Sequence, residues 1–461
     1  MLVGFAAASI VTSVVTGLAG AFIMPAESAH AAGAPAAAPS SIGHDSIGQR
    51  SIGSASIGDA PTSSGPGGAS GPRESAAAVF SSIQAVDPAA LPGFLSAHTA
   101  DLDRLLVDPP AAADVSQLWK LLDPARQSEL VKVAPHVVGN LEGVPYGIRG
   151  KANRLDLERT ISSAEARLRT GRGKAARVVL KRQLTMLGNV KTALAKKDGV
   201  SRTLVALDPS DDAKAAIVVG DLRTARYVSV LVPGMYMAAG EQIVGWSEVA
   251  QNLYDQQTGF LTRLGGTGTT KRTPGAAVVA WIGYQTPVLT NIGGRDLAQQ
   301  GADSLERTLI GIQSLRASNP PYLSVLAHSY GSTAALLALE RGTVTVDALA
   351  LMGSPGSDAQ SVNALGVRGG NVFVGEAAMD PIVNSAFFGS DPGSPSYGAK
   401  RMGVGGAVDP ITHRALAGSS GHNEYFTAGT ECMRNLALIG IDRGDLVLGG
   451  GPAATQAASS R

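Results

Sequence analysis

This chain has little cysteine and a small net charge. Cys432 is the single cysteine among 461 residues, so no internal disulfide can form, and disulfides say nothing about the compartment. Cys432 falls in a predicted helix, where we expect it to pack as a small apolar side chain. The formal net charge is +1 and only 16% of residues are charged. This composition indicates no basic face and hence no nucleic-acid partner.

Metal-binding patterns are also missing. The seven histidines are scattered and show none of the paired spacing of a zinc site. We therefore expect neither a metal nor another cofactor.

The N-terminal segment lacks charge altogether. Residues 2–24 contain no charged side chain and are long enough to span a bilayer, for which about 20 residues suffice. Ala29-His-Ala31 resembles a small-x-small cleavage site, although the usual basic start of a signal peptide is missing. Residues 1–31 are thus predicted to be a signal peptide or a membrane anchor. Export is the favoured location, secreted or anchored, with the cytoplasm as the alternative.

Residues 32–73 form a segment rich in Ala, Gly, Pro and Ser. Ser-Ile-Gly recurs there every five residues, beginning at Ser41, Ser46, Ser51 and Ser56. Each repeat has one apolar residue, so little surface can be buried against the entropy of ordering. We predict a flexible linker that could hold the protein to a membrane or cell wall through its N-terminus.

Residues 74–200 are predicted to be helical, because apolar residues recur there at spacings of three and four. The Lys- and Arg-rich run that ends near Lys197 fits a solvated helix face, with attraction to anionic lipid as the alternative. This region could dock on the following domain or stand independently. Residues 451–461 are predicted to be a disordered tail.

Residues 201–450 alternate between strand and helix patterns, which predicts an α/β domain with a mixed, mostly parallel sheet flanked by helices. The predicted strands are residues 203–207, 215–219, 227–232, 276–281, 322–326, 346–351 and 371–374. The predicted helices are residues 241–257, 295–317, 332–341 and 424–438. The loops at 265–275 and 389–410 are long enough that either could act as a lid.

A short apolar strand, a tight turn at Ser329 and a helix follow one another at residues 322–340. This order predicts a nucleophile elbow, in which small residues two positions before and after the serine let the strand and helix backbones approach. Ala327 and Gly331 fill those positions. The competing interpretation is a serine that merely caps the helix. A second match at Ala417-Gly-Ser-Ser-Gly421 lacks the flanking strand and helix, so we discount it.

A catalytic serine needs a base, and the base needs an orienting acid, in the chain order Ser, acid, His. His422 lies ahead of the last predicted helix and is the predicted base, with His413 as the alternative. Asp380 follows a β-rich run and precedes Pro381, which keeps it out of the helical region. It is the predicted acid; Glu376 and Asp391 remain competitors.

The oxyanion hole requires two backbone N–H groups. Tyr330 follows the nucleophile and supplies the first. Residues 227–232 form a buried strand that runs into a Pro-Gly turn, which makes Met235 the predicted second donor. An ordinary strand-to-helix turn is the competing interpretation.

Together these motifs resemble a bacterial α/β-hydrolase family that was long catalogued as a domain of unknown function. The resemblance rests on Val232-Pro-Gly-Met, Ala327-His-Ser-Tyr-Gly-Ser-Thr, Met352-Gly-Ser-Pro-Gly and Gly421-His-Asn-Glu-Tyr-Phe. Upstream, Trp119-Lys-Leu-Leu-Asp-Pro and the run from Gly139 to Asn153 resemble the helical leader of that family. The resemblance spans roughly residues 118–440. This sequence departs from the family's pattern at Ala327, where glycine is usual, and at Asn423, where serine is commoner.

The resemblance implies the α/β-hydrolase fold and a serine hydrolase of the esterase or lipase kind, with Ser329, Asp380 and His422 as the triad. The expected substrate is a small-molecule or lipid-like acyl ester, cleaved through an acyl-enzyme intermediate. Two alternatives stay open: a non-catalytic binding or surface protein on a hydrolase scaffold, and a serine peptidase.

Overall fold

The computed structural model describes residues 76–171, 173–195, 199–210, 212–265 and 275–449. The predicted signal peptide or anchor, the repeat linker, most of the 265–275 loop and the C-terminal tail lie outside these residues. Among the described helices, none combines the length and the apolar character needed to cross a bilayer.

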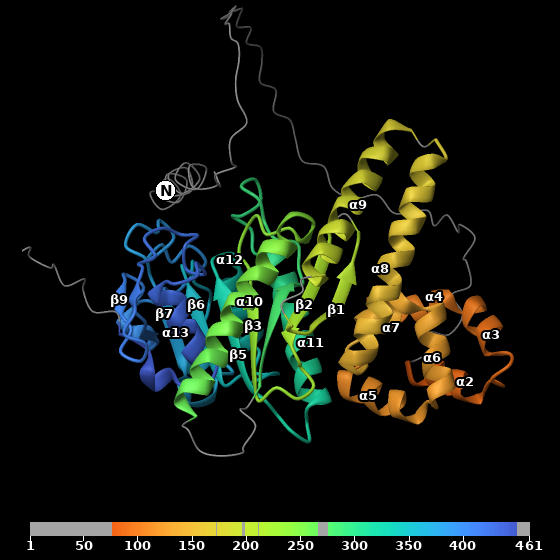
Figure 1. Cartoon of the computed structure of the whole chain (residues 1–461), viewed down its shortest axis with the longest axis horizontal. Coiled ribbons are helices and arrows are strands. Elements are labelled where there is room, and N and C mark those ends of the chain that lie inside the picture. The colour runs from red at the N-terminus through yellow and green to blue at the C-terminus, as the bar shows by residue number, and fades with distance from the viewer. Residues whose placement is uncertain (1–75, 172, 196–198, 211, 266–274, 450–461) are drawn as a thin grey trace, which may run out of the picture.

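An eight-stranded sheet forms the centre of the second half of the chain (Figure 1). The strand order is β1-β2-β4-β3-β5-β6-β7-β8. The β1–β2 and β2–β4 pairs are antiparallel and all other pairs are parallel, which confirms the predicted mixed sheet. The strands are β1 (Arg202–Asp208), β2 (Lys214–Gly220), β3 (Tyr227–Val232), β4 (Ala276–Ile282), β5 (Tyr322–His328), β6 (Ala348–Met352), β7 (Val372–Gly375) and β8 (Lys400–Arg401).

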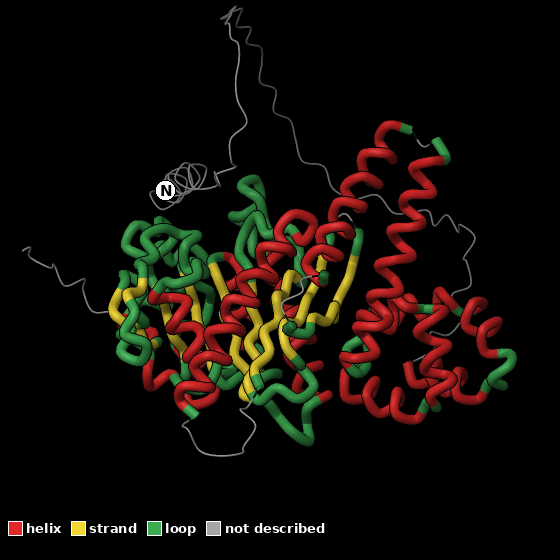
Figure 2. The backbone as a smooth tube through the Cα atoms, viewed as in Figure 1, coloured by secondary structure: helices red, strands yellow, loops and turns green. Residues whose placement is uncertain are grey.

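Helices cover both faces of this sheet, as Figure 2 shows. The central strands are continuous apolar runs because both of their faces are buried. On one face pack α9 (Lys174–Leu194), α10 (Ala239–Leu264) and α13 (Glu431–Ile439). On the other pack α11 (Asp296–Leu315) and α12 (Tyr330–Glu340).

The last helix is shorter than predicted. We expected a helix over residues 424–438, but α13 begins at Glu431, so the predicted start is wrong. The Glu424 carboxylate instead accepts a hydrogen bond from the Ser420 N–H, and the Thr430 hydroxyl caps the helix by accepting from the Met433 N–H. The residues between form turns, where a local side-chain bond to the backbone competes with helix formation.

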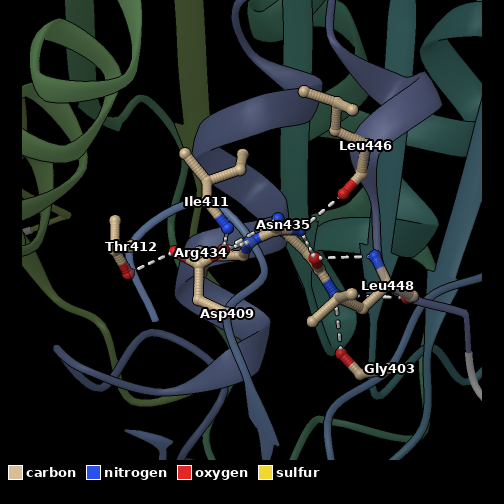
Figure 3. Close-up of polar contacts among 8 residues, drawn as sticks. All are labelled: Gly403, Asp409, Ile411, Thr412, Arg434, Asn435, Leu446 and Leu448. Carbon is tan, nitrogen blue, oxygen red and sulfur yellow. Dashed lines mark hydrogen bonds and ion pairs between the residues drawn. The ribbon is translucent and has the colours of Figure 1, made fainter. Parts of the chain in front are cut away.

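Three short strands were not predicted: β8 in the sheet, and β9 (Ala407–Val408) and β10 (Ala415–Leu416), which pair antiparallel with each other. The segment around them is fixed by polar side chains of α13 (Figure 3). Arg434 forms a buried ion pair with Asp409, with Nη2 and Oδ1 3.1 Å apart. Asn435 donates to the Gly403 carbonyl and accepts from the Leu448 N–H. Because their polar atoms are paired, these buried groups anchor the segment that leads to His422.

The described chain before β1 is helical. Six short helices enclose a core of their own that includes Phe80, Leu95 and Trp119. Two long helices follow, α8 (Tyr146–Arg169) and α9, which form a hairpin. The short helices are α2 (Ala76–Ala85), α3 (Leu91–Ala97), α4 (Thr99–Val107), α5 (Ala112–Leu121), α6 (Pro124–Val133) and α7 (Pro135–Asn140).

This helical region is docked on β1, the outer strand of the sheet. Asn140 accepts from the Leu207 N–H at 2.8 Å and donates to the Leu207 carbonyl at 2.9 Å. Asn153 donates to the Leu204 carbonyl at 3.0 Å, and Arg149 donates to the Val205 carbonyl. Side chains of the helical region thus supply hydrogen bonds that a neighbouring strand would otherwise make.

Candidate active site

Ser329 lies in the sharp turn between β5 and α12. Its backbone has φ 53° and ψ −132°, a conformation that non-glycine residues rarely adopt and that is typical of a nucleophile elbow. A Cβ on Gly331 would lie 2.2 Å from the Pro233 carbonyl oxygen, and Ala327 is fully buried. The two small residues are therefore needed for space, as the motif predicts.

The Ser329 side chain does not cap the helix. Although Ser329 occupies the N-cap position of α12, its hydroxyl makes no capping bond. The hydroxyl oxygen lies 2.8 Å from Nε2 of His422. The helix-cap interpretation is accordingly wrong for this residue.

His422 connects the serine to Asp380. Its Nδ1 lies 2.8 Å and 2.9 Å from the two carboxylate oxygens of Asp380. A carboxylate only accepts hydrogen bonds, so the proton resides on Nδ1 and the lone pair of Nε2 faces the serine hydroxyl. All three side chains are buried. The structure thus brings together the three residues that were predicted 42 to 93 positions apart in the chain.

Asp380 is held as an anion. Burial alone would raise its pKa, but hydrogen bonds from His422, from the Tyr425 hydroxyl at 2.6 Å and from the Ile382 N–H at 2.8 Å outweigh burial and lower the pKa. An ionised carboxylate at this place stabilises the Nδ1–H form of His422.

The predicted oxyanion donors lie beside the serine. A Cβ on Gly234 would come within 2.7 Å of the Ser329 Cβ, so the Pro-Gly turn that carries Met235 abuts the nucleophile. Within the described part of the chain, the backbone N–H groups of Met235 and Tyr330 have no acceptor. They are therefore available to a ligand.

Comparison with known proteins gives a family match over much of the sheet-containing part of the chain. Residues 208–390 match the model of a family described as alpha/beta hydrolase. Over these residues the chain is similar to that family, and its mostly parallel sheet flanked by helices has the α/β-hydrolase fold.

Relatives of this chain occur in mycobacteria. The uncharacterized protein Rv2079 of Mycobacterium tuberculosis is 28% identical in an alignment over 397 residues that covers 75% of this chain and 58% of that protein. The uncharacterized protein Rv0963c of the same species is 28% identical over 218 residues, 46% of this chain and 79% of that protein. The chain therefore spans less than two thirds of the first relative.

Two esterases are among the solved structures that the structural comparison found. An esterase/lipase from an uncultured bacterium has 10% identity and a TM-score of 0.32, over 57% of this chain and 91% of its own. The hyperthermophilic esterase of the archaeon Pyrobaculum calidifontis has 13% identity and a TM-score of 0.34, over 59% and 93% of the two chains.

The competing residues lie in other environments of the hydrolase domain. His413 is exposed. Glu376 forms an ion pair with Arg401 at 2.7 Å, and Asp391 accepts from the Gly393 N–H in a local turn. The structure does not bring any of these three candidates to Ser329.

The second serine motif makes a turn. The Ser419 hydroxyl donates to the Glu424 carbonyl at 3.2 Å, and the Ser420 hydroxyl donates to the Glu424 carboxylate. No histidine bonds to either hydroxyl in the described chain, in keeping with our rejection of this match.

Two further residues of the site were not predicted, His328 and Tyr425. The His328 Nε2 lies 2.7 Å from the His422 carbonyl oxygen, which can only accept, so Nε2–H donates. Burial, together with the neighbouring His422, lowers the pKa of His328 to about 3 and keeps its ring neutral. Tyr425 accepts from the Ala377 N–H at 2.9 Å while it donates to Asp380. Both residues thus fix the backbone or the side chains that present the base and the acid.

Gly353 gives a structural reason for the motif Met352-Gly-Ser-Pro-Gly. Its φ is 53°, and a Cβ there would lie 2.5 Å from Oδ2 of Asp380 and 3.0 Å from Nδ1 of His422. The glycine leaves room for the acid and the base to meet.

Among the described residues, no group of His, Cys, Asp and Glu side chains is arranged to hold a metal ion.

Proposed function

We propose that the protein is a serine hydrolase that cleaves carboxylic esters through an acyl-enzyme intermediate. The observation that carries this proposal is the continuous hydrogen-bond chain from the Ser329 hydroxyl through His422 to Asp380. Serine is a poor nucleophile unless a positioned base removes its proton, and this chain supplies such a base together with the group that orients it.

In the first half-reaction, Ser329 Oγ attacks the ester carbonyl carbon as its proton passes to Nε2 of His422. The carbonyl oxygen becomes an oxyanion, which the N–H groups of Met235 and Tyr330 bind. Collapse of this intermediate breaks the bond to the alcohol, which takes the proton from His422. The acyl group remains on Ser329.

In the second half-reaction, water attacks the acyl-enzyme and His422 takes its proton. Collapse of the second intermediate releases the carboxylic acid and returns the proton to Ser329. Throughout, the Asp380 anion stabilises the imidazolium that forms at each transfer. Such a carboxylate holds the ring in place without being protonated itself.

The test is covalent labelling of the full chain by a fluorophosphonate probe. Wild type should be labelled, whereas Ser329→Ala and His422→Ala should not, because each lacks a component that the attack on phosphorus requires. Ser419→Ala is the matched control and should be labelled like wild type. Failure of a folded wild-type protein to react would contradict the proposal and favour a binding protein on a hydrolase scaffold.

A substrate panel then separates an esterase from a peptidase. Acyl esters with chains of two to sixteen carbons should be hydrolysed, and Ser329→Ala should lose this activity. Turnover of peptides without turnover of esters would replace the ester assignment with a serine peptidase. Export, and attachment through residues 1–31, stay predictions.

A further inference from the structure

The α8–α9 hairpin projects beyond the hydrolase domain (Figure 1). The Asn189 side chain of α9 donates to the Gly240 carbonyl, at the start of α10. The Gln183 side chain donates to the Pro209 carbonyl, just past the end of β1. Earlier residues of α9 therefore extend past this edge of the sheet. At about 1.5 Å per residue, residues 174–182 extend roughly 13 Å further.

This is the edge that holds the candidate active site. β1 runs in the same direction as β3 and β5, because β1 and β4 are each antiparallel to β2, and β3 pairs parallel with both β4 and β5. Ser329 follows the carboxyl end of β5 and Met235 follows that of β3. The end of the hairpin and the candidate active site therefore face the same side.

The end of the hairpin is strongly basic. Its described residues, 165–171 and 173–182, contain one acidic side chain, Glu165, and six exposed basic ones. In the described part of the chain, none of these six side chains has an ion-pair or hydrogen-bond partner. They are Arg167, Arg169, Lys174, Arg177, Lys181 and Arg182.

Exposed apolar side chains accompany this charge. Val178 and Val179 are each 46% exposed on α9, beside the basic residues. At the active-site edge, Val288, Met379 and Phe387 are 41%, 72% and 37% exposed. They belong to loops that follow the carboxyl ends of β4 and β7. Exposed apolar groups together with a dense group of cations are the two features by which proteins bind the surface of a negatively charged membrane.

We propose that the end of the α8–α9 hairpin and the apolar loops at the active-site edge form one docking surface for an anionic lipid bilayer. The cations bind the headgroups, and the valines and the loop residues enter the interface. Docking in this way turns the carboxyl edge of the sheet, and Ser329 with it, toward the lipid.

The position of the only cysteine makes a direct test possible. Cys432 is fully buried, so a cysteine introduced on the surface can be labelled selectively in the full chain. Val178→Cys carries a nitrobenzoxadiazole probe at the hairpin end, and Lys191→Cys carries it about 20 Å along α9 toward the domain body. Vesicles contain either phosphatidylcholine alone or phosphatidylcholine with one quarter phosphatidylglycerol.

We expect the probe at position 178 to brighten and shift to the blue with the anionic vesicles alone, while the probe at 191 is unchanged. In the labelled protein, Lys174→Glu with Lys181→Glu should weaken this response by about 30-fold or more, since each lysine near an anionic surface contributes about fivefold. The matched control is Lys120→Glu with Arg263→Glu, which changes the net charge equally and should retain the response.

Three outcomes would overturn the proposal: no response at 178, an equal response at 191, or an equal loss in both charge-reversed proteins. A response to duplex DNA in place of vesicles would assign the surface to nucleic acid and also reject it. Ser329→Ala should bind vesicles like wild type. Loss of catalysis and loss of docking are therefore separate results.

Discussion

The helical region and the hydrolase domain each bury a group of polar side chains, and they use them differently. In the helical region, Asn140, Arg149 and Asn153 direct their donors to backbone carbonyls, including those of β1. In the hydrolase domain, a buried chain of hydrogen bonds ends at the Ser329 hydroxyl, beside two backbone N–H groups that have no acceptor in the described chain.

The comparison teaches how a structural polar cluster differs from a reactive one. Buried polar groups are normally satisfied within the protein. The donors of the first cluster follow that rule and stabilise the junction between two regions, whereas Oδ1 of Asn153 is buried without a partner in the described chain. The second leaves donors available beside a strained serine, as expected where a ligand completes the hydrogen bonding.

The largest expected effect is on catalysis and comes from a change at Asp380. Asp380→Asn preserves the shape of the side chain but removes its charge and should favour the wrong tautomer of His422. We expect kcat for ester hydrolysis to fall by about 10⁴-fold, as in other triads. The free energy of unfolding should change far less. Asp391→Asn is the matched control, and equal activity of the two variants would remove Asp380 from the triad.

A smaller effect is expected on the structural side. Arg149→Met removes the buried partner of Glu142 and the donor to Val205. Breaking a buried ion pair by removing one member destabilises a protein by about 3–5 kcal/mol. Urea unfolding should show this loss, whereas the exposed Lys151→Met on the same helix should be nearly neutral.

Activity distinguishes the two clusters in that experiment. The Arg149→Met protein that remains folded should keep the specific activity of wild type, because no atom of Arg149 reaches the triad. If kcat fell while the folded fraction stayed unchanged, the separation between structural and catalytic clusters would be wrong.

The smallest expected effect is on the free energy of unfolding at acidic pH. In the folded protein His328 has a pKa of about 3, against an ordinary value of 6.5, so between these values the unfolded chain binds more protons. The free energy of unfolding therefore falls as the pH falls through this window, by about 2 kcal/mol at pH 5. His328→Gln should lack this part of the loss.

Urea midpoints at pH 7.5 and pH 5 measure the acid effect. His413→Gln is the matched control, since its side chain is exposed, and it should lose stability on acidification as wild type does. Equal acid sensitivity of His328→Gln and wild type would show that His328 is not held neutral by the fold.

Much of the fold could be predicted from the sequence because the central strands are buried on both faces. Such strands are short continuous apolar runs, and those at residues 227–232 and 322–326 were placed within two residues of β3 and β5. The strands β8, β9 and β10 have two residues each and carry no such signal. The start of α13 depends on hydrogen bonds of Glu424 and Thr430 that compete with a plausible helical pattern.

The candidate site could also be predicted in part. Ser329, Asp380 and His422 each follow a strand or precede a helix, and the chain order of a triad links them. His328 and Tyr425 lie beside these residues in the same motifs, and adjacency was the available signal. Their roles depend on which atoms meet across 42 or more residues of sequence, and spacing along the chain does not reveal this.

The attachment of the helical region to β1 bears on self-association. An uncovered strand edge can pair with the edge of another molecule and begin an aggregate. At one side of this sheet the outer strand is β8, which has only two residues, and at the other it is β1, seven residues long and covered by Asn140, Arg149 and Asn153. A shortened chain that began at Ser201 would leave this long edge open. The helical region therefore protects the hydrolase domain from intermolecular strand pairing.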